Sequence, residues 1–259
     1  MYFKARIITR MLVAAAAAGM VGGSLGGCGK QEPDAASTKQ ALSASCKAGA
    51  DQMGAFLPRI ETQEPVTVGI DSRFTSAQQS EIMKSIDVWN DYGRKNTGRD
   101  FFRASVTRVP GGSQPAARED CKFSAGEANG SGFRIVKEDN SKYWKSLNLS
   151  EQNGAATVRC SSGGKLLRQV VMINTTNSPP EQFMSISLHE LGHTLGLGHS
   201  CTNGAGTADY ASCGSLQPDH AYRVAVMYPV LQLFGDGKVE TKELLRQNDT
   251  ERTDCLYKP

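Results

Sequence analysis

Three of the four histidines in this chain lie within eleven residues. The stretch from His189 to His199 reads HELGHTLGLGH, which follows the pattern H-E-x-x-H-x-x-G-x-x-H. On a helix, His189 and His193 lie one turn apart on the same face, so their imidazoles can bind one Zn²⁺. Gly196 tolerates the left-handed turn with which a helix often ends. That turn would bring His199 back as a third nitrogen ligand.

This set of side chains predicts a catalytic rather than a structural metal site. Three protein ligands leave a fourth position for water, as in catalytic zinc sites. Zinc lowers the pKa of such a water to about 7, and Glu190 would take its proton as general base. The alternative is a glycine-rich helix end with surface histidines, but chance placement explains the clustering poorly. We expect one zinc ion as cofactor and hydrolysis of an amide bond.

A second motif follows downstream, where residues 225–229 read AVMYP. Together the two motifs resemble the metzincin metallopeptidases, and the word HELGHTLGLGHS, with Ser200 after the third histidine, is most similar to the matrixin branch. The resemblance implies that Met227 is the Met-turn methionine, which lies beneath the zinc without binding it. It also implies a zinc-dependent endopeptidase that acts on proteins or peptides outside the cytoplasm.

The resemblance further implies an α+β, zincin-like fold. It contains a twisted mixed sheet of about five strands, an N-terminal helix, an active-site helix and a C-terminal helix. In the family, the strand before the active-site helix forms the lower edge of the sheet and holds substrate by main-chain pairing.

Local patterns predict where these elements lie. β-branched and apolar runs predict five strands, at residues 66–70, 101–109, 132–138, 155–160 and 166–173. Thr75, with Gln78 three residues later, predicts a capped helix that runs to about residue 94. The sequence SPPE at 178–181 predicts the start of the helix that carries the histidines, and residues 242–257 fit a C-terminal helix.

Several features of the matrixin branch have no counterpart here. No histidine precedes His189, so a structural zinc site is not supported. Residues 229–231 read PVL where the family often has Pro-x-Tyr, so its specificity cannot be transferred. Calcium is allowed but unsupported: residues 234–244 resemble half an EF-hand loop, yet Gln232 and Phe234 occupy ligand positions they cannot serve. Asp209 and Asp219 belong to no ligand ladder.

The N-terminus predicts export. Three basic residues precede an apolar run at 11–25, which is typical of a secretion signal. The sequence LGGC at 25–28 resembles a bacterial lipobox, in which Cys28 would carry the lipid; an unmodified Cys28 after a plain signal peptide is the alternative. We therefore expect a lipoprotein signal peptide (1–27), a tether or N-terminal extension (28–62) and a metzincin-like catalytic domain (63–259). The predicted location is the bacterial cell envelope, lipid-anchored in the periplasm or on the cell surface.

Charge and cysteine content agree with this location. The signal's three basic residues account for the whole formal charge of +3, so the rest of the chain has a formal charge near zero and no electrostatic case for nucleic-acid binding remains. We also expect a monomer. Lipidation of Cys28 would leave six cysteines and up to three disulfides. The pair Cys201–Cys213, in a loop that looks like an insertion, is the preferred single pairing. His220, in the same loop, is predicted to be a surface residue rather than a fourth ligand.

Two other functions remain open. The same site could serve a zinc amide hydrolase that acts on cell-wall peptide. Alternatively, the protein could be a non-catalytic, zinc-stabilised surface lipoprotein that binds a partner. Glu190 argues against the latter, because a purely structural site does not need that carboxylate.

Overall fold

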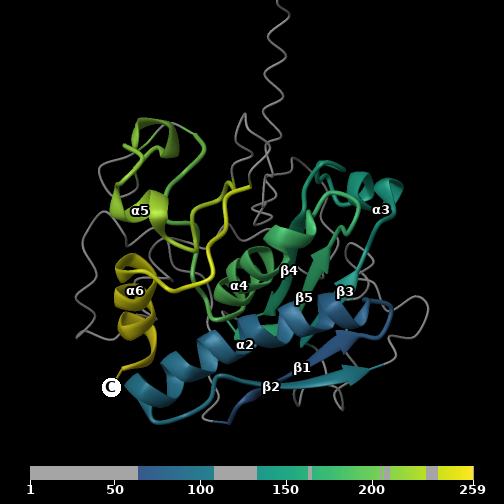
Figure 1. Ribbon diagram of the computed structural model, residues 1–259, viewed down its shortest axis with the longest axis horizontal. Coiled ribbons are helices and arrows are strands. Elements are labelled where there is room, and N and C mark those ends of the chain that lie inside the picture. Colours follow the sequence, from purple (N-terminus) through teal and green to yellow (C-terminus); the bar gives the residue numbers. More distant parts are fainter. Residues whose placement is uncertain are drawn as a thin grey trace, which may run out of the picture.

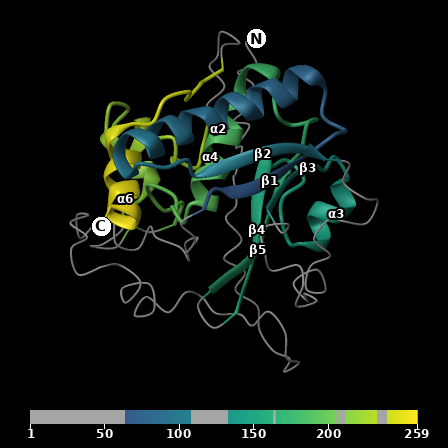
Figure 2. The same ribbon diagram turned by 90° about the horizontal axis from the view of Figure 1, so that it is seen from below.

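The computed structural model describes residues 64–107, 133–162, 165–204, 206, 211–231 and 239–258. Within these residues the fold is α+β, with one five-stranded mixed sheet and helices on both of its faces (Figures 1 and 2). The strands are β1 (Val66–Asp71), β2 (Phe102–Thr107), β3 (Phe133–Lys137), β4 (Ala155–Ser162) and β5 (Lys165–Ile173). The prediction of an α+β fold with about five strands is confirmed, and the arrangement is consistent with a zincin-like fold.

The order of strands in the sheet is β2-β1-β3-β5-β4. β4 is antiparallel to β5, and the other neighbours are parallel. The expectation that the strand before the active-site helix forms the edge is therefore wrong: β5 lies inside, and β4 forms the edge. β5 lies inside because it pairs with β3 on one side and with β4 on the other, and the pairing of β4 with β5 extends as far as Ser162 and Lys165. Two intervening residues suit antiparallel neighbours and are too few for a parallel crossover.

Helix α2 (Ser76–Thr97) begins and ends with local signals. Thr75 caps its N-terminus in a capping box with Gln78, as predicted. The helix runs three residues past the predicted end, because Gly98 supplies the left-handed conformation (φ 75°) that stops it.

The main core lies between one face of the sheet and the two long helices, α2 and α4 (Phe183–Thr194). A short 3₁₀ turn, η2 (Pro180–Gln182), leads into α4, as the sequence SPPE predicted. Trp89 of α2 is fully buried, and its indole N–H donates to the Leu188 carbonyl of α4 at 3.0 Å. The two helices are thus joined by a specific bond as well as by packing.

A smaller core covers the opposite face of the sheet. Trp144 of the short helix α3 (Ser141–Ser146), which the sequence patterns did not predict, packs there against Val136, Val170 and Met172. Ala156 and Val158 of β4 face this smaller core, whereas Ala155 of the same strand belongs to the main core. Side chains of β4 therefore alternate between the two faces.

The C-terminal helix, α6 (Gln247–Tyr257), begins five residues later than predicted. Residues 242–246 do not continue the helix, because the Asp249 carboxylate accepts from the Arg246 N–H at 2.9 Å and fixes the start there. The Lys242 side chain is buried and donates to the Arg223 and Ala225 carbonyls. None of the described helices is long and apolar enough to cross a membrane.

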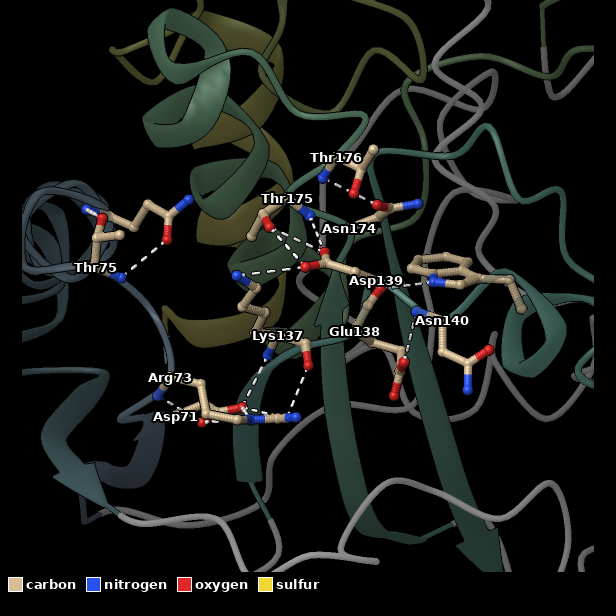
Figure 3. A network of polar contacts seen from close by, with 12 residues as sticks. Asp71, Arg73, Thr75, Lys137, Glu138, Asp139, Asn140, Asn174, Thr175 and Thr176 are labelled. Carbon is tan, nitrogen blue, oxygen red and sulfur yellow. Dashed lines mark hydrogen bonds and ion pairs between the residues drawn. The ribbon is translucent and has the colours of Figure 1, made fainter.

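A polar network joins the carboxyl ends of β1 and β3 (Figure 3). The fully buried Asp71 carboxylate accepts from the Arg73 guanidinium and from the Lys137 N–H. Arg73 in turn donates to the Lys137 carbonyl at 2.8 Å. Next to it, Asp139 accepts from the backbone and hydroxyl of Thr175, which follows β5. The network fixes three neighbouring strand ends.

Candidate metal centre

The three histidines of the motif converge on one point. His189 and His193 lie on α4, and His199 follows the turn at Gly196, whose φ is 95° as the sequence predicts for this position. The Nε2 atoms of His189 and His193 are 3.1 Å apart, and those of His193 and His199 are 3.2 Å apart. One ligand atom of each residue lies within 4.8 Å of the others, so the cluster could hold a metal ion.

Backbone carbonyls fix the orientation of two of the rings. His189 Nδ1 lies 2.7 Å from the Val226 carbonyl oxygen, and His193 Nδ1 lies 2.7 Å from that of Leu197. A carbonyl can only accept, so both Nδ1 atoms carry hydrogen and both Nε2 atoms present lone pairs.

The facing lone pairs fit a bound cation. The lone pairs of His189 and His193, 3.1 Å apart, repel one another unless a positive ion lies between them. A tetrahedral ion with zinc–nitrogen bonds of about 2.0–2.1 Å separates its ligand atoms by roughly 3.3 Å. The donor set and its spacing therefore suit zinc.

The surroundings favour neutral imidazoles. Burial lowers the pKa of His189 to about 4, although its bond to Val226 opposes the shift. Burial, together with the charges of neighbouring groups, lowers the pKa of His193 and His199 well below 6.5. Neutral imidazole is the form that binds metal, so the site requires no deprotonation at pH 7.

Glu190 lies on the same helix and is fully buried. Its Oε2 accepts a hydrogen bond from the hydroxyl of Thr157, which reaches it from β4. Its Oε1 is buried and accepts no hydrogen bond from any described residue. Burial raises the pKa of Glu190 to about 8, although Thr157 and Arg159 oppose the shift.

Met227 packs directly against the helix that carries the ligands. A Cβ added at Gly192, next to His193, would lie closer than 3.0 Å to the Met227 sulfur. Met227 is fully buried, and Trp89 lines the other side of the same gap. Glycine at position 192 therefore allows Met227 to pack against the helix that carries the histidines, and its role as a Met-turn residue stays a prediction.

Helix α6 holds both the turn at 225–229 and the third histidine in place. The buried Asp249 carboxylate accepts from the N–H groups of Val226 and Met227 at 2.9 and 3.1 Å. The guanidinium of Arg252 donates to the carbonyls of Gly198 and His199 at 3.0 and 3.4 Å.

Sequence reasoning missed Thr157, Asp249 and Arg252. Asp249 and Arg252 stand three apart, so the one available signal was a charged pair on one helix face. Charged helix faces are usually exposed, which hides this role. Thr157 gave no signal, because its partner is 33 residues away.

The segment after His199 is closed by the predicted disulfide. Cys201 and Cys213 are bonded, which confirms that pairing. Cys213 opens a 3₁₀ turn, η3 (Cys213–Ser215), and Cys255 of α6 is also disulfide-bonded. His220 is exposed and caps the short helix α5 (Ala221–Val224), which fits the prediction of a surface residue.

Other sequence predictions fall outside the described residues. These are the signal peptide with Cys28, the tether, Asp209 and residues 234–238 of the segment that resembles half an EF-hand loop.

No family model matches the chain, and no curated protein matches it. A solved structure described as "Structure of Myroilysin" is similar over 85% of each chain, with 13% sequence identity and a TM-score of 0.38. The chain's own fold and site thus define its class: an α+β protein, consistent with a zincin-like fold, with a three-histidine cluster that could hold a metal ion.

Proposed function

We propose that this protein is a zinc-dependent endopeptidase of the metzincin type, similar to the matrixin branch. The observation that carries the proposal is the convergence of three imidazole nitrogens beside Glu190. A carboxylate on the same helix, one residue from a ligand, is what general-base catalysis at a metal requires.

The roles of the side chains follow from their positions. When bound, zinc supplies a Lewis acid that polarises the substrate carbonyl and acidifies water. Glu190 accepts the proton of the attacking water at Oε1, the oxygen that no described residue engages, and then passes it to the leaving amine. His189 and His193 keep their ligand nitrogens deprotonated through their bonds to backbone carbonyls.

The edge strand supports a peptide as the substrate. A hydrogen bond from Thr157 of β4 to Glu190 of α4 joins the edge strand to the helix. Within the described sheet, β4 pairs only with β5, so its other side is open. An extended peptide could add to its outer side by main-chain pairing, which would place a backbone amide near the histidines.

Two other functions could use the same cluster of histidines. Hydrolysis of cell-wall peptide would use the same residues, so substrate tests must distinguish it. A non-catalytic, zinc-stabilised lipoprotein is disfavoured by Glu190, because a fully buried carboxylate with an unengaged oxygen destabilises the fold without a structural benefit.

The test compares wild-type protein with Glu190→Gln after zinc loading. Casein, a peptide library and peptidoglycan serve as substrates. We expect both proteins to bind one zinc, and we expect Glu190→Gln to cleave casein and peptides at least about 100-fold more slowly. Equal rates would refute the mechanism, and cleavage of peptidoglycan alone would favour the cell-wall hydrolase.

We further propose that the protein is exported and lipid-anchored through Cys28 in the cell envelope, as a monomer. Support comes from the signal sequence and from the disulfide Cys201–Cys213, which is typical of an oxidising compartment. Cys28→Ala should abolish labelling by a fatty acid and release the protein from the membrane fraction. Retention with unchanged labelling would contradict the anchor.

A further inference from the structure

The edge strand presents two polar side chains to the metal centre. Thr157 and Arg159 lie two and four residues after Ala155, which faces the main core, so they share its face of the sheet. Both reach α4: Thr157 donates to the Glu190 carboxylate, and Arg159 donates to the His193 carbonyl at 3.2 Å.

The contact between Thr157 and Glu190 is buried on both sides. Thr157 is 1% exposed and Glu190 is fully buried. Among the described residues, Thr157 is the one hydrogen-bond donor to this carboxylate, because Arg159 acts on it through its charge alone.

We propose that Thr157 is a positioning residue for Glu190. Its hydroxyl holds Oε2 against β4, and this leaves Oε1 as the oxygen that receives the proton. The inference rests on the proposed function for its catalytic meaning, whereas the contact itself does not depend on that function.

A flexible glutamate needs such a tether. Its side chain has three rotatable bonds, and small displacements of a catalytic group cost large factors in rate. The edge strand is also the place proposed for peptide binding, so one strand would align both the substrate and the base. The competing explanation is that Thr157 only joins β4 to α4 structurally.

Kinetics of two matched variants separate these explanations. Thr157→Val has nearly the same shape but no hydroxyl, whereas Thr157→Ser keeps the hydroxyl. With zinc-loaded protein and a peptide substrate, we expect Thr157→Val to lower kcat at least tenfold with KM within twofold of wild type. Thr157→Ser should restore kcat to within threefold. Equal loss in both variants, or loss that appears in KM, would overturn the proposal.

A second arm needs neither metal nor activity. In metal-free protein, Thr157→Val should lower the midpoint of thermal unfolding, because it leaves a buried oxygen of the Glu190 carboxyl group without its hydrogen-bond partner. In a Glu190→Ala background, the same substitution should not lower the midpoint. Equal decreases in both backgrounds would show that Thr157 does not act through Glu190.

The kinetic and the metal-free experiments distinguish a failure of the proposed function from a failure of the proposed role of Thr157. Absence of turnover by wild-type protein would refute the proposed function, and the metal-free comparison would still decide whether Thr157 holds Glu190.

Discussion

At the scale of single residues, the candidate metal centre combines side chains that the sequence reveals with others that it conceals. The spacing of His189, His193 and His199 predicts a shared metal, and the three rings do converge. Gly196 adopts the left-handed conformation that its type and place suggest. Thr157 could not be found in this way, because its role depends on a strand that lies beside α4 only after folding.

The third histidine provides a direct test at this scale. His199→Ala removes one of three ligands, so zinc affinity should fall at least about 100-fold, beyond the 10–100-fold typical of changes to residues around the ligands. His220→Ala is the matched control, because His220 is exposed and lies outside the cluster. Titration with a competing zinc chelator measures both. Similar affinities for the two variants would remove His199 from the site.

Gly192 gives a second prediction for a single position. In Gly192→Ala the new Cβ would overlap the Met227 sulfur, so the free energy of unfolding should fall by about 1–3 kcal/mol. Gly204→Ala is the control, because the nearest atom to its added Cβ would be 3.6 Å away. Denaturant unfolding measures both proteins, and an unchanged Gly192→Ala would contradict the close packing of Met227.

At the scale of elements, local signals and long-range pairing differ in how well they can be predicted. The capping box at Thr75 and the proline turn before α4 lie within a few residues, and both are observed as predicted. The edge position of β4 depends on pairing between separate strands, and the expectation for β5 was wrong. The predicted start of α6 was also wrong. Asp249 fixes the start of the helix by accepting from the Arg246 N–H, and the same carboxylate accepts from the Met227 N–H.

The strand-end network makes an element-scale prediction about pH. Burial alone would raise the pKa of Asp71, but hydrogen bonds from Arg73 and the Lys137 N–H, with the Arg73 charge, lower it below 3.8. Because the pKa is lower in the folded chain, the stabilisation from Asp71 is fully present above pH 3.8 and is lost as the pH falls through the lowered value.

Asp71→Asn tests this network. The free energy of unfolding at pH 7 should fall by about 1–3 kcal/mol, because Arg73 and the Lys137 N–H lose their buried, charged acceptor. The difference from wild type should shrink as the pH falls below 3.8. Asp87→Asn, on the exposed side of α2, is the control. A difference that stays constant down to the lowest accessible pH would contradict the ionised state of Asp71.

At the scale of the whole molecule, segments far apart in sequence meet at one centre. Helix α4 carries His189, His193 and Glu190, the edge strand β4 bonds to Glu190, and α6 bonds to the turn at 225–229 and to the chain after His199. Metal binding should therefore stabilise the whole fold, since ligands that bind only the folded state raise its stability.

Zinc removal tests this coupling between metal and fold. At a free zinc concentration about 100 times the dissociation constant, stabilisation should be about 2.7 kcal/mol, and a chelator should reverse it. Calorimetry with and without chelator measures the shift in unfolding temperature. His199→Ala should show a much smaller shift, whereas an equal shift would indicate that zinc binds elsewhere.

The most direct test of the account is the metal content of the folded wild-type protein. Elemental analysis after zinc loading and removal of free metal should find one zinc per chain, held by the three imidazoles. Folded protein that retains no transition metal at any loading would contradict the assignment of the site and the function built on it.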